Sequence, residues 1–390
     1  MEEVDESFGP GSQAALRDAN QQRVARVLQS SGELTQAEIA RSTGLAPATV
    51  SNIIRDMTND GVVVVSELRG RRRVVRLAPS VGLVVGIDFG HRHVTVAVSD
   101  MAHEIRAEHR AELGVETSAA GGIARAASLL QTALNDLDAD MSAVVGIGMG
   151  LPAPIDGHSG EVGAPSILPG WVGMDAAAMM SERFGMRVAV DNDANLGVLA
   201  EHMWGAGVGV DNMAYLKLSD GVGAGLVLNG KLFRGRDGTA GEIGHTTMDE
   251  FGAVCRCGNR GCLETIVASG AVLELLEPRR GRGLTIPDVV QMARDGDKAC
   301  ERILTDTGRH VGVAVANLCN IFNPELILVG GELAIAGELL MAPMREVVRR
   351  CGIPSATANL QILPAALGAR APVLGAVALA LQAAQIPLNS

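Results

Sequence analysis

Aromatic side chains are scarce in this chain: they make up 2% of its 390 residues, with one Tyr and two Trp. Buried cores must therefore be built from Val, Leu, Ile and Ala, and aromatic platforms that stack on bases are not expected. A long apolar run is also lacking, because residues 371–384, the most apolar stretch, are too short to span a bilayer and predict a packed helix. Residues 1–6 are acidic, which excludes a secretory signal peptide. We expect a soluble cytoplasmic protein of two or three domains that does not contact a membrane.

The charge of the chain is unevenly distributed. The net charge of −11 argues against nucleic acid, yet residues 12–80 carry ten Arg against six acidic side chains. Five of these Arg fall within residues 69–76, and residues 81–390 are strongly acidic. A basic front end on an acidic body is typical of a DNA-binding domain joined to a soluble carrier domain.

Residues 12–78 predict a winged helix-turn-helix domain. Thr35 and Glu38 have the spacing of a capping box, which opens a short helix that ends near Gly44. In the following helix, residues 47–57, apolar side chains repeat on one face and small polar side chains remain on the other. Two short helices joined by a Gly turn are typical of a helix-turn-helix.

Two short strands, residues 62–66 and 74–77, flank an Arg-rich tip and predict a wing that lies against phosphates or in a minor groove. The candidate contacts to double-stranded operator DNA are Thr35, Gln36, Pro47, Ala48, Thr49, Ser51, Asn52, Arg55, Arg69, Arg71, Arg72 and Arg73. The alternative is a three-helix interaction module whose basic run is solvated. The helix pattern and the wing together favour DNA.

The body of the chain predicts a duplicated α/β architecture. A strand that ends in Asp88-Phe89-Gly90 is followed by an alternating partner strand, and the same arrangement returns around Asp220-Gly221. Two such units indicate two lobes that face a cleft, as in the actin-like sugar kinases, where Gly turns approach phosphate with backbone N–H groups. The predicted lobes are residues 81–190 and 191–390, with a C-terminal helix over about residues 371–386 that packs back on the first lobe.

A second candidate site lies where a strand over residues 188–190 runs into a helix. Asn192 and Asp193 follow this strand, and strand ends are where open α/β folds place ligand-binding groups. Asp193 is suited to act as a general base for a sugar hydroxyl, with Asn192 bonded to a neighbouring hydroxyl. The alternative is that Asp193 or Asn195 only caps the helix.

The most specific motif combines one His with three Cys. His245, Cys255, Cys257 and Cys262 supply a full tetrahedral zinc set, and glycines allow the short loop to fold around an ion. Neither a fourth Cys nor a second His lies nearby, so we expect a closed, structural Zn²⁺ site. The ring nitrogen of His245 that does not bind zinc is expected to face the ligand. The other cysteines are expected to be small buried side chains: Cys300, Cys319 and Cys351.

These motifs together resemble the ROK family (repressor, open reading frame, kinase), and the resemblance extends over nearly the whole chain from about residue 15. It implies an N-terminal winged helix-turn-helix followed by a two-lobed actin-like sugar-kinase fold with a zinc loop. The residues implied to contact sugar hydroxyls are Asn192, Asp193, Glu242, His245 and Glu264. Asp193 would correspond to the base of the family's kinases, and family members that carry the DNA-binding domain are repressors.

Two departures from the family's kinases concern the phosphate loops and the sugar site. Where the kinases have Gly-Thr after Asp-x-Gly, this chain has His91-Arg92, and its second phosphate turn carries Asp220. A bulky pair and a carboxylate near the phosphates disfavour ATP, so we expect no enzymatic activity and regard Asp193 as a relic base. An Asn common in the sugar kinases is replaced by Ile167, and Ser166 is the candidate that compensates for the lost hydrogen bond.

Three hypotheses follow from these residues. The preferred one is a dimeric or tetrameric sugar-responsive transcriptional repressor whose operator binding is modulated by a sugar or sugar derivative in the cleft. The second is an active ATP-dependent sugar kinase with a fused DNA-binding domain. The third is a regulator that has lost sugar binding and responds to a protein partner.

Overall fold

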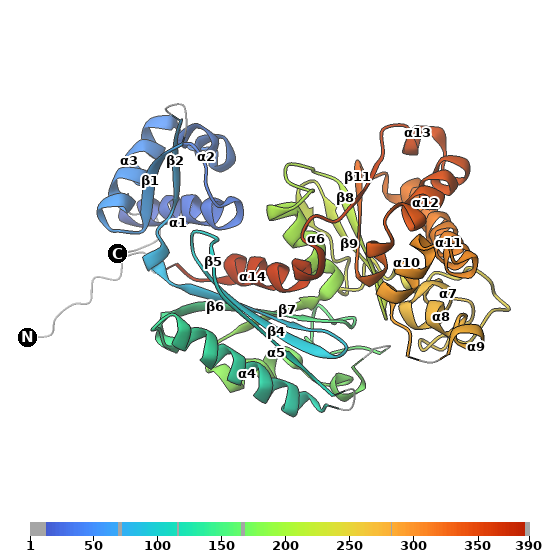
Figure 1. The fold of residues 1–390 in the computed structure, drawn as a ribbon. Helices are drawn as coiled ribbons and strands as arrows, with labels where there is room; N and C mark the ends of the chain where they lie inside the picture. The colour runs from blue at the N-terminus through green and yellow to red at the C-terminus, as the bar shows by residue number, and fades with distance from the viewer. Residues whose placement is uncertain (1–12, 69–71, 115–116, 165–167, 282, 387–390) are drawn as a thin grey trace, which may run out of the picture.

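The structure, a computed structural model, describes residues 13–68, 72–114, 117–164, 168–281 and 283–386. An N-terminal domain is followed by two α/β lobes, each built on a five-stranded sheet (Figure 1). This order of parts is the one that the sequence predicts. The departures Ser166 and Ile167 and the wing residues Arg69 and Arg71 lie outside the described residues.

Three helices and a two-stranded ribbon form the N-terminal domain: α1 (Gln13–Ser31), α2 (Gln36–Thr43), α3 (Pro47–Asn59), β1 (Val63–Leu68) and β2 (Arg72–Leu77). Thr35 caps α2 through the predicted capping box with Glu38, and Gly44 ends it in the left-handed conformation at φ 70°. The third helix buries four apolar side chains and continues past its predicted end at residue 57. The two strands pair antiparallel and form the predicted wing.

The first lobe is a mixed sheet of β3 (Leu83–Phe89), β4 (His93–Asp100), β5 (Ile105–Glu112), β6 (Val144–Leu151) and β7 (Val188–Asn192). Its strands lie in the order β5-β4-β3-β6-β7. The first three pair antiparallel, and β6 and β7 run parallel to β3. The helices α4 (Ala119–Asp136) and α5 (Ala176–Phe184) pack against this sheet.

The second lobe repeats this topology with β8 (Met213–Leu218), β9 (Val222–Leu228), β10 (Lys231–Leu232), β11 (Leu326–Gly330) and β12 (Gln361–Pro364). The order is β10-β9-β8-β11-β12, with antiparallel and parallel pairs in the same places as in the first sheet. The predicted duplication is therefore present in the fold. Its further helices are α7 (Glu264–Val267), α8 (Ser269–Glu274), α9 (Glu277–Arg280), α10 (Ile286–Arg294), α11 (Lys298–Phe322), α12 (Glu338–Cys351) and α13 (Pro354–Thr357).

Two apolar helices, α6 (Asp193–Trp204) and α14 (Ala371–Ala383), pack together between the lobes (Figure 1). The pair is held at glycines: a Cβ on Gly375 of α14 would lie 2.0 Å from the carbonyl oxygen of Leu196 in α6. The same helix packs on β6, where a Cβ on Gly148 would lie 2.2 Å from the oxygen of Ala376. The C-terminal helix thus contacts both β6 and α6. It ends at Ala383, three residues before its predicted end.

The N-terminal domain shares a hydrophobic core with the body. Val24 and Leu28 of α1 belong to the same buried cluster as Val377 and Leu381 of α14. The remaining short elements are 3₁₀ turns at Pro79–Val81, Met141–Ala143, Pro169–Trp171, Ile243–His245, Glu332–Ala336 and Gly368–Arg370. No helix in the described part of the chain is long and apolar enough to cross a membrane.

One sequence prediction about the thiols is wrong. Cys300 and Cys319 are buried as expected, but Cys351 is exposed. It is the last residue of α12, and the buried residues of this helix end at Val348.

Candidate functional site

A pocket opens where the start of α6, the turn between β8 and β9, and the loop that follows Gly241 meet. It is lined by Pro152, Ala153, Pro154, Asn192, Asp193, Lys217, Gly221, Val222, Gly223, Ala224, Gly241, Glu242, His245, Arg256 and Glu264. All five side chains that the sequence analysis assigned to sugar contacts therefore line one pocket. The backbones at Gly241 and Gly244 run against strand β9, and a Cβ on Gly241 would lie 1.9 Å from the oxygen of Ala224. These glycines let the loop that carries Glu242 lie close to the sheet.

Asp193 is the first residue of α6 and is buried at 5% exposure. Its carboxylate forms an ion pair with the ammonium group of Lys217, which comes from β8. Burial raises the pKa of Asp193 above its ordinary value, although the charge of Lys217 opposes the shift. Burial alone would lower the pKa of Lys217, but the carboxylate of Asp193 raises it above its ordinary value. Asp193 and Lys217 therefore depend on each other inside the pocket. Nothing in the sequence indicated the cationic partner.

Asn192, the residue before α6, makes two local contacts. Its Oδ1 accepts a hydrogen bond of 2.8 Å from the backbone N–H of Ala194, and its Nδ2 donates one of 3.0 Å to the oxygen of Ala153. Asn192 is thus the N-cap of α6, a role that the alternative in the sequence analysis gave to Asp193 or Asn195. Asn195 donates instead to the buried carboxylate of Asp191 at 2.8 Å. The side chain of Asn192 therefore lines the pocket and links the start of α6 to the backbone at Ala153.

Glu264, the first residue of α7, is buried and paired on both oxygens. One oxygen accepts from the backbone N–H of Val222 at 2.9 Å, and the other lies 2.8 Å from Nε of Arg256. Arg256 also donates to the backbone oxygen of Asp220 at 2.9 Å. Arg256 therefore ties the cysteine-rich loop to the turn between β8 and β9. The sequence analysis did not single it out, because an Arg between two Cys has no special signature.

Glu242 differs from the other pocket carboxylates. Within the described residues, no Lys or Arg lies at ion-pair distance from it, and Nε2 of His245 lies 3.9 Å from its carboxylate. Burial raises the pKa of Glu242 to about 7, and the nearby carboxylates of Asp193 and Glu264 add to the shift. Glu242 is therefore the carboxylate of this pocket that is open to a hydrogen-bond donor on a ligand.

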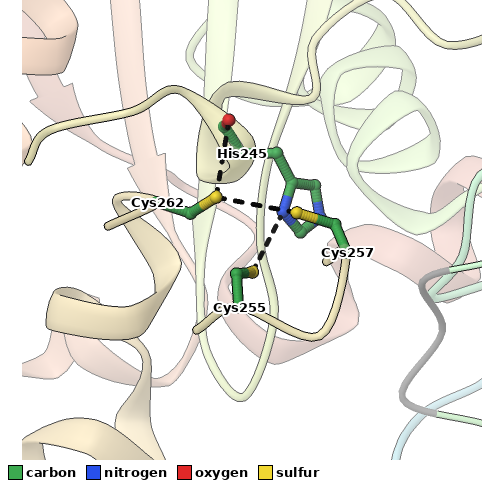
Figure 2. A group of neighbouring side chains, drawn as sticks. All are labelled: His245, Cys255, Cys257 and Cys262. Atoms are coloured by element: carbon green, nitrogen blue, oxygen red, sulfur yellow. Dashed lines mark hydrogen bonds between the residues drawn. The ribbon is translucent and has the colours of Figure 1, made fainter. Parts of the chain in front are cut away.

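His245 connects this pocket to the cysteine cluster. Its Nδ1 lies 3.5 Å from the sulfur of Cys255 (Figure 2). Its Nε2 lies 3.9 Å from Glu242. The sulfurs of Cys257 and Cys262 are 3.6 Å apart. The four ligand atoms all lie within 4.8 Å of one another, so these side chains can hold a metal ion. A single ring thus belongs to both sites.

The first Gly turn of the body is filled by a side chain. The imidazole of His93 lies 3.4 Å from the buried carboxylate of Asp88, and a Cβ on Gly90 would lie 2.1 Å from the same ring. The second Gly turn carries Ser219, whose hydroxyl accepts from the backbone N–H of Glu332 at 2.9 Å.

Most of the predicted DNA contacts in the described part of the winged domain are exposed. Five of the predicted helix residues are exposed: Gln36, Pro47, Ala48, Ser51 and Asn52. Arg55 is exposed as well and lies 3.3 Å from Asp56. Thr49 is half-buried, and Thr35 is used in its capping box. On the wing, Arg73 is exposed and Arg72 begins β2.

Both the N-terminal domain and the body of the chain match models of known protein families. Residues 84–383 match the model of the ROK family, and residues 17–64 match a winged helix-turn-helix DNA-binding model. The xylose repressor of Caldicellulosiruptor bescii is 30% identical over 95% of this chain and 97% of the relative. The DNA-binding transcriptional dual regulator NagC of Escherichia coli is 29% identical, covering 95% of each chain.

Solved structures agree with these matches. A ROK family transcriptional regulator described as a homolog of the E. coli MLC protein superposes with a TM-score of 0.78 and 25% identity, over 94% of this chain and 96% of the other. A ROK family glucokinase from Streptomyces griseus, in complex with glucose and AMPPNP, superposes with a TM-score of 0.68 and 29% identity, over 77% of this chain and all of the other. The predicted two-lobed sugar-kinase fold is therefore confirmed, and the chain belongs to the ROK family.

Proposed function

We propose that this protein is a transcriptional repressor that releases its operator when a sugar or sugar derivative binds in the pocket around Asp193. The observation that carries the proposal is the presence of a DNA-binding domain and a carboxylate-lined pocket in one chain, joined through a shared core. A relative that matches over 95% of this chain is named xylose repressor. In this role the protein would act in the cytoplasm and would need no contact with a membrane.

The DNA-binding part of the proposal rests on the outer face of the winged domain. Small polar side chains such as Ser51 and Asn52 are exposed on α3, where they can reach base edges in a major groove. Exposed Arg73 on the wing supplies charge for phosphate contacts. A dimer, or a tetramer built from dimers, would place two such helices on a roughly palindromic operator.

The sugar-binding part rests on the chemistry of the pocket. Carboxylates accept hydrogen bonds from hydroxyl groups, and Glu242 is the one that has no Lys or Arg partner among the described residues. Asp193, Glu264 and His245 complete a ring of polar groups around the same space. A sugar that closes the two lobes around this ring would favour one interlobe arrangement, and a coupling of about 1–3 kcal/mol to operator affinity is typical of such regulators.

Zinc fits the cysteine cluster. Around a tetrahedral Zn²⁺ ion, ordinary Zn–S and Zn–N bond lengths place two sulfurs about 3.8 Å apart and a nitrogen about 3.6 Å from a sulfur. The corresponding separations here are 3.6 Å between Cys257 and Cys262 and 3.5 Å between His245 and Cys255. Four protein ligands leave no open position, so the ion would be structural, and it would hold the loop that presents Arg256 and orient the ring of His245.

The second candidate function, a sugar kinase with a fused DNA-binding domain, is favoured by Asp193 and by the similarity to the solved glucokinase. In such an enzyme Asp193 would remove the proton from a sugar hydroxyl as it attacks the terminal phosphate of ATP. Here the carboxylate already forms an ion pair with the ammonium of Lys217. By resemblance to the family's kinases, His91, Arg92 and Asp220 would occupy the phosphate loops and disfavour ATP. Sugar-dependent ADP formation that disappears in Asp193→Asn would establish the kinase; we expect none above background.

The direct test of the repressor is fluorescence anisotropy at fixed salt, because phosphate contacts make DNA affinity strongly salt-dependent. DNA from upstream of the protein's own gene is titrated with the protein, alone and with xylose, glucose, N-acetylglucosamine and their phosphorylated forms. We expect specific binding that one of these compounds weakens. Specific binding that no sugar changes would leave a DNA-binding regulator with a different signal, and the absence of specific binding would refute the proposal.

A further inference from the structure

The turn between β4 and β5, residues 100–104, lies at the contact between the winged domain and the body; we name it the junction turn. Buried Asp100 accepts hydrogen bonds from the backbone N–H groups of Ala102 at 2.9 Å and Glu104 at 3.1 Å. These bonds hold His103 at φ 68°, a left-handed conformation that is uncommon for a residue other than Gly. The turn therefore fixes the backbone from which the ring of His103 projects.

The ring of His103 is enclosed by two helices that belong to different parts of the molecule. Its Nε2 donates to the backbone oxygen of Gln29, near the end of α1, at 2.9 Å. Its other contact is Trp204, the last residue of α6, whose ring lies edge-on at 5.6 Å between centroids and 87° between planes. The chain after α1 passes so close that a Cβ on Gly32 would lie 3.3 Å from the ring. His103 thus bridges the DNA-binding domain and α6.

At its other end, α6 begins in the ligand pocket. Asp193 is its first residue, and the residues from there to Glu201 are all buried. The helix has 12 residues, which at about 1.5 Å per residue corresponds to a rod of roughly 18 Å. Because α6 is buried and pressed against α14 at Gly375, it cannot bend freely. A displacement of α6 as a rod would therefore move both Asp193 and Trp204.

The DNA side of the junction is held at two further points. The amide of Gln29 donates 2.8 Å to the backbone oxygen of Ala384, just after α14, and this bond is buried. On the wing, Arg76 of β2 lies 3.2 Å from Glu104 of the junction turn. The turn therefore contacts α1, on which the recognition helix α3 packs, and also the strand that carries the wing.

We propose that His103 and Trp204 are positioning residues that transmit ligand binding at Asp193 to the DNA-binding domain. This inference rests on the proposed function. A ligand that draws the lobes together shifts α6, Trp204 then displaces the ring of His103, and the bond to Gln29 that orients α1 is weakened. The effect requires two arrangements of the lobes that the ligand and the operator favour unequally.

The test uses the full-length protein and a duplex selected by the wild type from a random-sequence pool. His103→Asn removes the ring and keeps a residue that tolerates the left-handed conformation, and Trp204→Leu removes the opposite ring. Operator Kd is measured by anisotropy with and without the most effective of xylose, glucose and N-acetylglucosamine, and sugar Kd by calorimetry. His109→Asn is the matched control, because His109 pairs with Asp136 on α4 instead of the winged domain.

In the wild type and in His109→Asn, sugar should weaken operator binding by about 5- to 150-fold, the usual range of coupling. In His103→Asn and Trp204→Leu the two affinities should persist while this ratio falls toward one, and Trp204→Phe, which keeps a ring, should restore most of it. A purely structural role would lower both affinities and leave the ratio unchanged. Full coupling in both ring-removing variants would overturn the proposal.

A second readout does not depend on variants of the junction. With Trp171→Phe, Trp204 becomes the sole tryptophan, and the replacement keeps a ring against Phe89, which lies 5.1 Å from Trp171. Saturation with the duplex or with sugar should shift the emission of Trp204. Constant emission in a protein that binds both would contradict the proposal. A protein that binds sugar and no duplex would refute the repressor function, while a sugar-dependent emission change would still support movement of α6.

Discussion

Lys217 and Asp193 form an ion pair almost removed from water, with 16% of the lysine and 7% of the aspartate side chain exposed. Replacing Lys217 by Met preserves most of the buried volume and removes the positive charge. The carboxylate of Asp193 is then left in the pocket without its cation. Breaking one partner of a buried pair typically costs about 3–5 kcal/mol of unfolding free energy.

The penalty should depend on pH in a defined direction. Burial already raises the pKa of Asp193, and Lys217 is the main group that opposes the shift, so the pKa rises further in Lys217→Met. A carboxyl with a raised pKa holds a proton in the folded chain at a pH where the unfolded chain has lost it. Stability therefore falls as pH rises, by up to about 1.4 kcal/mol per unit of pKa difference. The variant should be weakest at neutral pH and approach the wild type on acidification.

The assay is chemical and thermal unfolding, followed by circular dichroism at neutral and mildly acidic pH. The double variant Lys217→Met with Asp193→Asn removes both charges, so it should recover most of the lost stability. Lys298→Met is the control, since Lys298 is exposed and pairs with Glu301 on the surface. If Lys217→Met unfolds like the control at neutral pH, or if the double variant is no more stable than the single one, the description of a buried, mutually dependent pair is wrong.

Four further predictions concern the metal, the DNA surface, the junction and the pocket. Chelation should lower the melting temperature and the sugar response together, because a metal bound only by the folded loop contributes to folding; unchanged melting would remove the zinc assignment. Arg73→Ala should weaken binding to all duplexes alike and flatten the salt dependence, whereas Asn52→Ala should weaken the operator selectively, as anisotropy at several salt concentrations will reveal. Burial lowers the pKa of His103 below 6.5, so below that pH the unfolded chain gains a proton that the folded chain resists. Stability should thus fall as pH drops below about 6.5 in the wild type and less so in His103→Asn, measured by melting temperature. Asp193→Ala should abolish the sugar response and keep operator binding; a normal response would refute the pocket assignment.

Features with a local signature were predictable from the sequence. The winged domain follows from a capping box, a Gly turn and helical periodicity, all of which act over a few residues. The cysteine cluster follows from ligand types within a short loop, since glycines allow the loop to fold around an ion. The duplication of the lobes follows from a repeated strand–Gly-turn–strand pattern, which the two sheets reproduce.

Contacts between distant segments were not predictable. Lys217 lies in an ordinary strand pattern, and nothing local indicates that its side chain meets Asp193. Likewise, His103 occupies a polar turn, and its contacts with Gln29 and Trp204 arise only when the winged domain packs on the body. The alternative drawn from the sequence placed the helix cap at Asp193 or Asn195, whereas Asn192 is the cap, because all three polar residues suit that position.

The central claim is that one chain links a sugar in the pocket to DNA on the winged domain. Linkage requires that the effect be reciprocal: if sugar weakens operator binding, operator must weaken sugar binding by the same factor. The decisive measurement is therefore the sugar Kd, determined by calorimetry for the free protein and for the protein saturated with operator. We predict weaker sugar binding to the operator complex, by the factor seen in the anisotropy titrations. Equal sugar affinity in the two states would contradict the account.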